Sequence, residues 1–316
     1  MVKFISLMGK LLIVGTVAFD AIETPLGKTD KILGGSAPFI GLSASKLGVD
    51  SAIVSIVGGD FPEHYLSLFE QNSINTTAIE IIPEEKTFFW SGKYHNDMNT
   101  RDTITTDLNV LSKFNPIVPK AYQNASVVVL GNLSPGDQSK VIDQITNDKA
   151  LIILDTMNYW MNNTLDELLE VLKRVDVITI NDEEARQLTG ESSLVIAARK
   201  IHDMGPSYVV IKKGEHGALL FQNSSIFFAP ALPLEEVFDP TGAGDTFAGG
   251  FAGYLTQTND FSFDNMKNAV VYGSAMASFC VEKFGPERML NLSEREIFSR
   301  LQAFKTLTQF DIELMN

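Results

Sequence analysis

The stretch Asp239–Phe251 has residue types and spacing with a clear chemical meaning. Its three small residues Gly242, Ala243 and Gly244 stand directly before an apolar helical run at 246–255. Backbone N–H groups at such a helix start can converge on a negatively charged oxygen, which the helix dipole also stabilises. The stretch therefore predicts an anion-binding site at a helix N-terminus.

Asp245 lies within that predicted anion site. A carboxylate is an odd choice beside a bound phosphate, because the two negative charges repel each other. A general base that takes a proton from an attacking hydroxyl group would explain it. Helix capping explains the same residue, since Asp is favourable in a first turn.

A second group of candidates lies near the N-terminus. Asp20 follows the first expected strand, and Gly34 and Gly35 open the next helix. A carboxylate accepts hydrogen bonds from the hydroxyl groups of a polyol, and paired glycines let the backbone approach a ligand closely. These residues predict an acceptor site at the carboxyl edge of a sheet. A turn residue and a plain helix-entry turn are the competing interpretations.

Two further turns carry candidate residues. Asn181 ends a strand, and Glu184 stands three residues later in the following helix. Glu184 can orient magnesium-bound waters, and the same spacing also satisfies a capping box, so the two interpretations are compatible. The turn Lys212–Gly217 follows another strand and borders either a ligand or a simple strand-turn-strand connection.

The elements that must position these residues alternate regularly. Short apolar runs rich in Val and Ile predict strands, and amphipathic stretches between them predict helices, which together indicate a parallel sheet covered on both faces. The expected strands are 11–15, 51–57, 126–130, 151–155, 177–181 and 208–212. The expected helices are 39–47, 63–71, 165–173, 183–188 and 195–204.

Two polar stretches, at about 22–33 and 87–108, interrupt this alternation and predict inserted strands that form a small flap. A flap beside an open sheet can close over a ligand as a lid, and ordinary hairpin decoration is the alternative. Arg101 on the flap is placed to meet a substrate anion, although a lone Arg is often simply solvated.

Charge and composition exclude several classes of protein. Lys and Arg number 25 against 39 Asp and Glu, a formal net charge of −14, so nucleic acid and anionic membranes are not expected partners. The apolar start Phe4–Phe19 is expected to form a buried strand, and no apolar run reaches the ~20 residues of a membrane span. The single Cys280 fits a reducing compartment, and we expect a cytoplasmic protein.

The stretch Asp239–Phe251 resembles, nearly residue for residue, the C-terminal signature of the ribokinase-like carbohydrate kinases, the PfkB family. The first strand, the early glycine pair, the Asn-x-x-Glu and the signature also occur in family order. The resemblance implies an α/β fold: a ribokinase-like three-layer sandwich around a mostly parallel sheet, with a β-strand lid. It implies a single kinase domain over residues 1–316.

The resemblance also implies ATP and Mg²⁺ as cofactors and phosphoryl transfer to a sugar or nucleoside hydroxyl. Asp245 becomes the catalytic base, residues 242–244 the anion hole, and Asp20 with Gly34 and Gly35 the acceptor contacts. Glu184 would act on Mg²⁺ through water, and Asp239 and Thr241 match positions beside a monovalent cation such as K⁺. The expected nucleotide-binding residues are Asn181, Lys212, Gly214, Gly217 and Ser274.

Two departures from the family pattern limit the range of acceptors that we expect. No Asn follows the glycine pair as it does in ribokinases, and the segment Asp155–Trp160 lacks the Arg of sugar-acid kinases. We expect a neutral sugar phosphorylated on a primary hydroxymethyl group, with a nucleoside acceptor or a non-catalytic ligand sensor as alternatives. A dinucleotide-dependent oxidoreductase is disfavoured, because no Gly-x-Gly-x-x-Gly follows the first strand. The resemblance also implies homodimerisation through the flaps.

Overall fold

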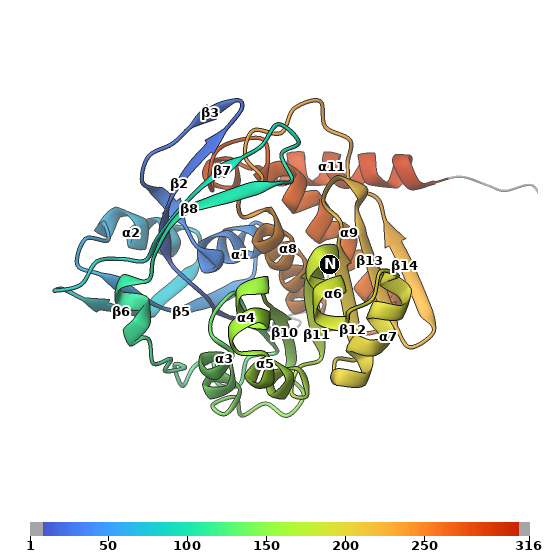
Figure 1. Ribbon diagram of the computed structural model, residues 1–316, viewed down its shortest axis with the longest axis horizontal. Helices are drawn as coiled ribbons and strands as arrows, with labels where there is room; N and C mark the ends of the chain where they lie inside the picture. The colour runs from blue at the N-terminus through green and yellow to red at the C-terminus, as the bar shows by residue number, and fades with distance from the viewer. Residues whose placement is uncertain (1–8, 310–316) are drawn as a thin grey trace, which may run out of the picture.

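The computed structural model describes residues 9–309, and within them the main sheet has nine strands in the order β14-β13-β12-β11-β10-β9-β1-β5-β6 (Figure 1). All neighbours from β12 to β6 pair in parallel, and β13 and β14 are antiparallel. The strands are β1 (Lys10–Val14), β5 (Asp50–Gly58), β6 (Ile74–Ile82), β9 (Val127–Leu130), β10 (Leu151–Asp155), β11 (Val177–Asn181), β12 (Tyr208–Lys212), β13 (Ala218–Gln222) and β14 (Ser225–Ala229).

Helices cover both faces of this sheet. One face carries α1 (Ser36–Ser45), α2 (Glu63–Gln71), α8 (Ala243–Thr258), α9 (Phe263–Cys280), α10 (Glu287–Leu290) and α11 (Glu294–Thr308). The other carries the 3₁₀ helix η1 (Asn109–Lys113) and α3 (Pro135–Ile142), α4 (Asn158–Asn163), α5 (Leu165–Leu172), α6 (Asp182–Thr189) and α7 (Leu194–Met204). A 3₁₀ turn, η2 (Gly214–His216), joins β12 to β13.

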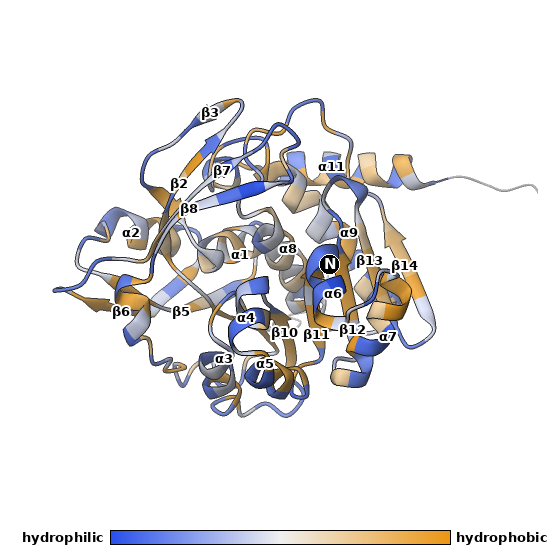
Figure 2. Cartoon of the chain, in the orientation of Figure 1, coloured by the Kyte–Doolittle hydropathy of each residue, from blue (hydrophilic) through white to orange (hydrophobic). Residues whose placement is uncertain are grey.

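Two hydrophobic cores hold the three layers together. Successive residues of a strand point to opposite faces, so Leu11 and Ile13 pack under α8 and α9 while Leu12 and Val14 pack under α3 and α5. Figure 2 shows the resulting apolar strands between helices of mixed polarity. The predicted α/β sandwich is confirmed, and all six expected strands are present. Within residues 9–309, none of the helices has the length and apolarity needed to cross a bilayer.

The predicted flap is a second sheet of five strands within the described residues. It consists of β2 (Ala18–Thr24), β3 (Gly27–Lys28), β4 (Ile32–Gly34), β7 (Phe89–Tyr94) and β8 (Arg101–Asp107). The flap begins at Ala18 rather than at Ile22, because the chain leaves the main sheet after Val14 and enters the second sheet at once. The prediction of a single strand over Phe4–Phe19 was therefore wrong. The range spans β1 and the start of β2, and residues 4–8 lie outside the described residues.

The sheet contains a topological switch point between β1 and β9. From β1 the chain continues toward β5 and β6, whereas from β9 it continues toward β10 and β11. The connections therefore leave in opposite directions at the carboxyl ends of two adjacent strands, where open α/β sheets bind ligands. Asp155, Asn181 and Lys212 end β10, β11 and β12 at this same edge.

Glycine contacts fix the position of α8 above the switch point. A Cβ atom on Gly249 would lie 2.3 Å from the backbone oxygen of Ile40 in α1. On the opposite side, a Cβ atom on Gly273 of α9 would lie 2.8 Å from the backbone oxygen of Phe247 in α8. The three helices pack backbone to backbone, which leaves α8 no room to slide.

This packing predicts the effect of a single methyl group. Gly249→Ala should lower the free energy of unfolding by about 1–3 kcal/mol, because its Cβ atom meets backbone that cannot rotate away. Gly136→Ala in α3 is the matched control: its Cβ atom would meet only two side-chain oxygens, Glu167 Oε2 at 3.4 Å and Ser134 Oγ at 4.0 Å. Urea unfolding of both variants measures the difference, and equal stability would contradict the account of the packing.

Candidate active site

The first turn of α8 forms the floor of the site. Gly242 is the N-cap residue, with a left-handed φ of 75° and no side-chain capping bond. A Cβ atom there would also lie 2.5 Å from the Phe39 ring, so only glycine fits. The N–H of Ala243 donates to Pro240 O at 3.2 Å, whereas those of Gly242 and Gly244 donate to none of the described residues. The turn therefore presents unpaired donors at the positive end of a helix.

Asp245 follows immediately in the same turn and is only partly exposed. Burial raises the pKa of its carboxyl group to about 7, and the nearby Asp155 charge adds to this rise. Lys212 and Arg101 oppose the rise in the same pKa. A carboxyl group with a pKa near 7 is well matched to accepting a proton at neutral pH.

Lys212 and Asp155 form an ion pair beside this turn. Lys212 Nζ donates to Asp155 Oδ2 at 2.9 Å, and both side chains are largely buried. Burial would lower the pKa of Lys212, but the neighbouring Asp155 and Glu184 charges raise it above its ordinary value. The ammonium group is therefore charged at neutral pH.

Asn181 and Glu184 form the capping box of α6. The Asn181 side chain accepts from Glu184 N at 2.8 Å, and Glu184 Oε2 accepts from Asn181 N at 3.0 Å. Burial, followed by the charge of Asp155, raises the pKa of Glu184 to about 7. Within residues 9–309, no three His, Cys, Asp or Glu side chains are grouped to hold a metal ion by themselves.

Asp20 lies in the flap sheet, within β2, rather than directly after the first strand of the main sheet as expected. Gly34 ends β4 and pairs with Ala18 of β2, and a Cβ atom on Gly34 would lie 2.1 Å from Asp20 Oδ2. Gly35 is the N-cap residue of α1. Burial raises the pKa of Asp20 to about 7, the charges of Asp239 and Asp245 raise it further, and a hydrogen bond to the Gly35 backbone lowers it. The carboxyl group therefore lies close to the α8 turn.

Several side chains of the flap contact loops at the carboxyl edge of the main sheet. Buried Tyr94 at the end of β7 accepts a hydrogen bond from Thr241 Oγ1 at 3.1 Å. Arg101, the first residue of β8, is exposed, yet its charge lowers the pKa values of Asp20, Glu184 and Asp245. At the hairpin tip, Asn99 Oδ1 lies 3.3 Å from the place of a Cβ atom on Gly214. The flap therefore contacts both the α8 loop and the β12–β13 turn.

Asp239 holds the loop before α8 in place. Its side chain is fully buried, Oδ1 accepts from Thr241 N at 2.9 Å, and Oδ2 accepts from Gly285 N at 2.9 Å. Burial raises the pKa of Asp239, and these two backbone bonds lower it. The carboxylate thus ties two segments far apart in the sequence.

Gly217 and Ser274 are the other expected nucleotide-binding residues. Gly217 has a left-handed φ of 82° and closes the β12–β13 turn. Ser274 is half-buried in α9, and no hydrogen bond among the described residues joins it to the α8 turn or the strand ends. The charges of Asp20, Arg101, Glu184, Lys212 and Asp245 act on one another, so the structure brings these five residues together.

Sequence reasoning missed the flap contacts of Tyr94 and Asn99. Tyr94 follows Trp90 by four residues along β7, so the two share one face of the strand, and that alternation was the available signal. Asn99 sits in a polar hairpin whose reach depends on the whole flap, and no local pattern marks it.

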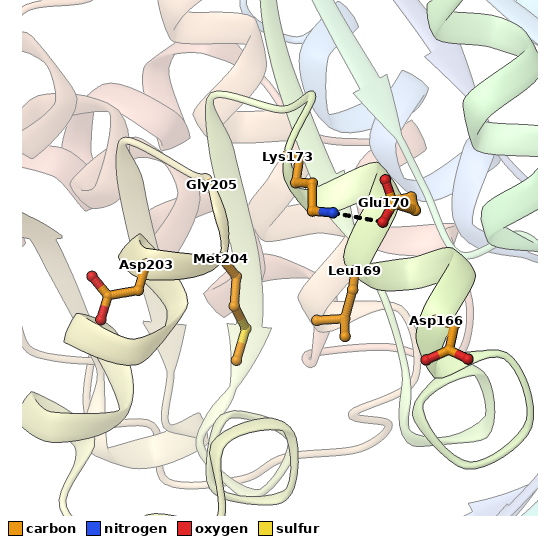
Figure 3. Close-up of a pocket in the computed structure, with 7 residues that line it drawn as sticks. All are labelled: Asp166, Leu169, Glu170, Lys173, Asp203, Met204 and Gly205. Carbon is orange, nitrogen blue, oxygen red and sulfur yellow. Dashed lines mark hydrogen bonds and ion pairs between the residues drawn. The ribbon is translucent and has the colours of Figure 1, made fainter.

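A surface cavity of about 530 Å³ lies elsewhere, between α5 and α7 (Figure 3). Lys173 and Gly205, which line it, lie just before β11 and β12, at the amino edge of the sheet. The side chains of Asp166 and Asp203 lie at opposite sides of it, and Lys173 pairs with Glu170 at 2.6 Å. Its residues are separate from the carboxyl-edge group.

Solved structures share this architecture. The nucleoside kinase of Methanocaldococcus jannaschii aligns with a TM-score of 0.76 at 22% identity, covering 94% of this chain and 99% of that one. A ribokinase from Giardia lamblia aligns with a TM-score of 0.79 at 16% identity, with the same coverages of 94% and 99%. The fold is therefore ribokinase-like.

Sequence comparison identifies the family. Residues 8–291 match the pfkB family of carbohydrate kinases, and the chain belongs to this family. A cytidine kinase of Thermococcus kodakarensis is 32% identical over 249 residues, covering 77% of this chain and 88% of that protein. A nucleoside kinase of Methanothermobacter thermautotrophicus is 26% identical over 306 residues, covering 88% and 91%. A ribokinase of Haemophilus influenzae is 26% identical over 281 residues, covering 84% and 86%.

The raised pKa of Asp245 predicts a pH-dependent effect on stability. A folded-state pKa of about 7, above the ordinary 3.8, means that this group favours folding below pH 4 and loses that contribution as pH rises through 7. Asp245→Asn should therefore raise the Tm of the ligand-free protein by about a few °C at pH 8 and much less at pH 5.

Asp264→Asn is the matched control for this experiment. Asp264 also lies in a first helical turn, that of α9, but its side chain is 89% exposed and pairs with Lys267. Its replacement should change Tm little at either pH. If Asp245→Asn instead lowered Tm equally at both pH values, the folded protein would not disfavour the charged form of this carboxyl group, and the prediction would be wrong.

Proposed function

We propose that this protein transfers the γ-phosphoryl group of ATP to a primary hydroxyl group of a ribose-containing acceptor. One observation carries the proposal: Asp245, with a pKa near 7, stands beside Lys212 at the uncapped N-terminus of α8. A base and an anion-binding turn in one place suit the transfer of an anionic group to an alcohol. The family of the chain supports the same chemistry.

Each residue has a defined task in the proposed reaction. Asp245 takes the proton of the acceptor hydroxyl as its oxygen bonds to the γ-phosphorus, and the bond between that phosphorus and the β–γ bridging oxygen breaks to release ADP. The N–H groups of Gly242 and Gly244 stabilise the charge on the phosphoryl oxygens. Asp20 accepts hydrogen bonds from the other hydroxyl groups of the acceptor and orients it.

Kinases of this family use ATP and Mg²⁺, and the residues of this chain fit that use. Mg²⁺ keeps much of its water shell and is usually held by substrate phosphates with one or two carboxylates, so a cage of three protein ligands is not needed. Glu184 would be the carboxylate that holds such waters. The metal would neutralise phosphate charge near a turn already crowded with carboxylates.

The acceptor is proposed from the relatives together with the flap. Cytidine, other nucleosides and ribose share a ribose unit, and these acceptors stand in the names of three relatives. A nucleoside is favoured by Trp90, which pairs with Asp20 across β2 and β7, so both side chains lie on one face. The half-buried Trp90 ring carries the Arg101 guanidinium 5.6 Å from its centre. An aromatic surface beside the proposed hydroxyl contact suits a base attached to the sugar.

Free ribose or another neutral sugar is the second candidate. It needs only Asp20 and Gly35 and leaves Trp90 without a ligand. A non-catalytic sensor on the same fold has no use for a carboxyl group at the α8 turn whose pKa is about 7. A sensor therefore fits the site less well.

Three further features belong to this proposal. Asp239 and Thr241 would adjoin a K⁺ ion, although both Asp239 oxygens already accept backbone N–H groups. Homodimerisation through the flap would cover its exposed apolar residues, Leu26 and Ile104 among them. A cytoplasmic location, away from nucleic acid and membranes, fits the acidic chain and its single buried cysteine.

The proposal is tested by ADP release with Mg-ATP and a panel of nucleosides, ribose, fructose and sugar phosphates. Nucleosides should give the highest kcat/KM, and Asp245→Asn should lower kcat by at least 100-fold because the base is lost. ATP binding by the variant, measured by calorimetry, should change less than threefold. ADP release that needs no acceptor, or a variant with normal turnover, would refute the proposal.

A further inference from the structure

Lys212 reaches across the carboxyl edge of the sheet to its partner. It ends β12, Asp155 ends β10, and β11 lies between these strands. The Lys212 ammonium donates to Asp155 Oδ2 at 2.9 Å, with the two side chains only 17% and 9% exposed. An ammonium group has three donors, and among the described residues the structure pairs it with this one acceptor.

The ammonium group also lies against the first turn of α8. A Cβ atom on Gly244 would come 3.2 Å from Lys212 Nζ, so the absence of a side chain there keeps the charge next to the backbone. A cation is unfavourable at a helix N-terminus, because the helix dipole is positive at that end. The neighbouring carboxylates, Asp155 first, offset this repulsion.

The local arrangement is therefore a fixed positive charge beside unpaired backbone donors. The N–H groups of Gly242 and Gly244 are free of partners among the described residues, and the ammonium stands next to them. A ligand that uses all of these groups must be an anion with several oxygens on one centre. A phosphoryl group meets this requirement, because its three peripheral oxygens can accept from backbone and side chain together.

Asp155 is placed to hold the lysine. Its Oδ1 accepts from the backbone N–H of Thr156 at 2.9 Å, which fixes the carboxylate, and its Oδ2 receives the lysine. The carbonyl oxygen of Asp155 accepts from Gln138 Nε2 at 3.3 Å, which ties the strand end to α3. The acceptor of the lysine is thus anchored by bonds that do not involve any ligand.

We propose that Lys212 is a catalytic residue whose ammonium hydrogen-bonds the phosphoryl group during its transfer, and that Asp155 is its positioning residue. The proposal rests on the proposed kinase function and names the group that Lys212 contacts. The acceptor oxygen bonds to phosphorus, the bond to the bridging oxygen breaks, and the acceptor proton passes to Asp245. Lys212 keeps its proton throughout and acts only through charge and hydrogen bonding.

This role differs from two simpler ones. A lysine that anchors the nucleotide would act equally on ADP and ATP, so its loss would weaken both. A lysine that only neutralises Asp155 would become dispensable once Asp155 is neutral. A contact made to the phosphoryl group in transit acts on kcat far more than on nucleotide affinity.

Four variants separate these roles: Lys212→Met, Asp155→Asn, the two combined, and the control Lys173→Met. The control removes one lysine charge from an exposed ion pair at the opposite edge of the sheet. Lys212→Met should lower kcat by about 100-fold or more while changing the Kd of ADP less than threefold. The combined variant should remain as slow, and Lys173→Met should match the wild type.

A binding measurement complements the kinetics. The wild type should bind Mg-ADP with aluminium fluoride, which resembles the phosphoryl group in transit, at least tenfold more tightly than Mg-ADP. Lys212→Met should lose most of that difference. Lys212→Arg keeps the charge and serves in place of Met if the Met variant does not fold, and it should retain part of the activity lost in the neutral variant.

Three results would overturn the role of Lys212. They are near-normal turnover in the combined variant, an equal loss of ADP affinity and kcat, or an unchanged preference for aluminium fluoride in Lys212→Met. Normal turnover in Lys212→Met with loss in Asp245→Asn would remove this inference and leave the kinase proposal intact. Loss of the kinase proposal itself would appear as a wild type without acceptor-dependent turnover.

Discussion

The fixed position of α8 is the constraint on which the site depends. Glycines place α8 within backbone contact of α1 on one side and of α9 on the other, and the helix also packs against β1 and β9 at the switch point. Its first turn therefore stands above the carboxyl edge where Asp155 and Lys212 end their strands. A helix that rotated or slid would carry Asp245 away from the lysine, so packing far from the turn sets the chemistry at the turn.

Electrostatics at this turn follow from that placement. An acidic chain of net charge −14 must bind an anion, and it does not do so with a broad basic surface. The site instead combines unpaired backbone donors with one buried lysine. Burial raises the pKa values of the carboxyl groups of Asp20, Glu184 and Asp245 to about 7, which reduces their negative charge at neutral pH. The flap adds Arg101, whose charge acts on all three.

Much of this arrangement could be predicted from residues adjacent in the sequence. The residues of the α8 turn lie in one continuous stretch of sequence. The strands of the main sheet are apolar enough to identify, since both of their faces are buried. Asp20 could be singled out, but its place in the flap could not, because a strand that leaves one sheet for another has no local signal. The contacts of Tyr94 and Asn99, and the ion pair of Lys212 with Asp155, join segments distant in the sequence and follow only from the assembled fold.

The central claim is that the site delivers a phosphoryl group to a primary alcohol rather than to water. Phosphorus-31 NMR of the enzyme with Mg-ATP and the best acceptor tests this directly. We expect a new phosphomonoester signal split by the two protons of a CH₂ group, growing in step with ADP. Inorganic phosphate as the sole new signal, or a phosphoester coupled to a single proton, would contradict the account.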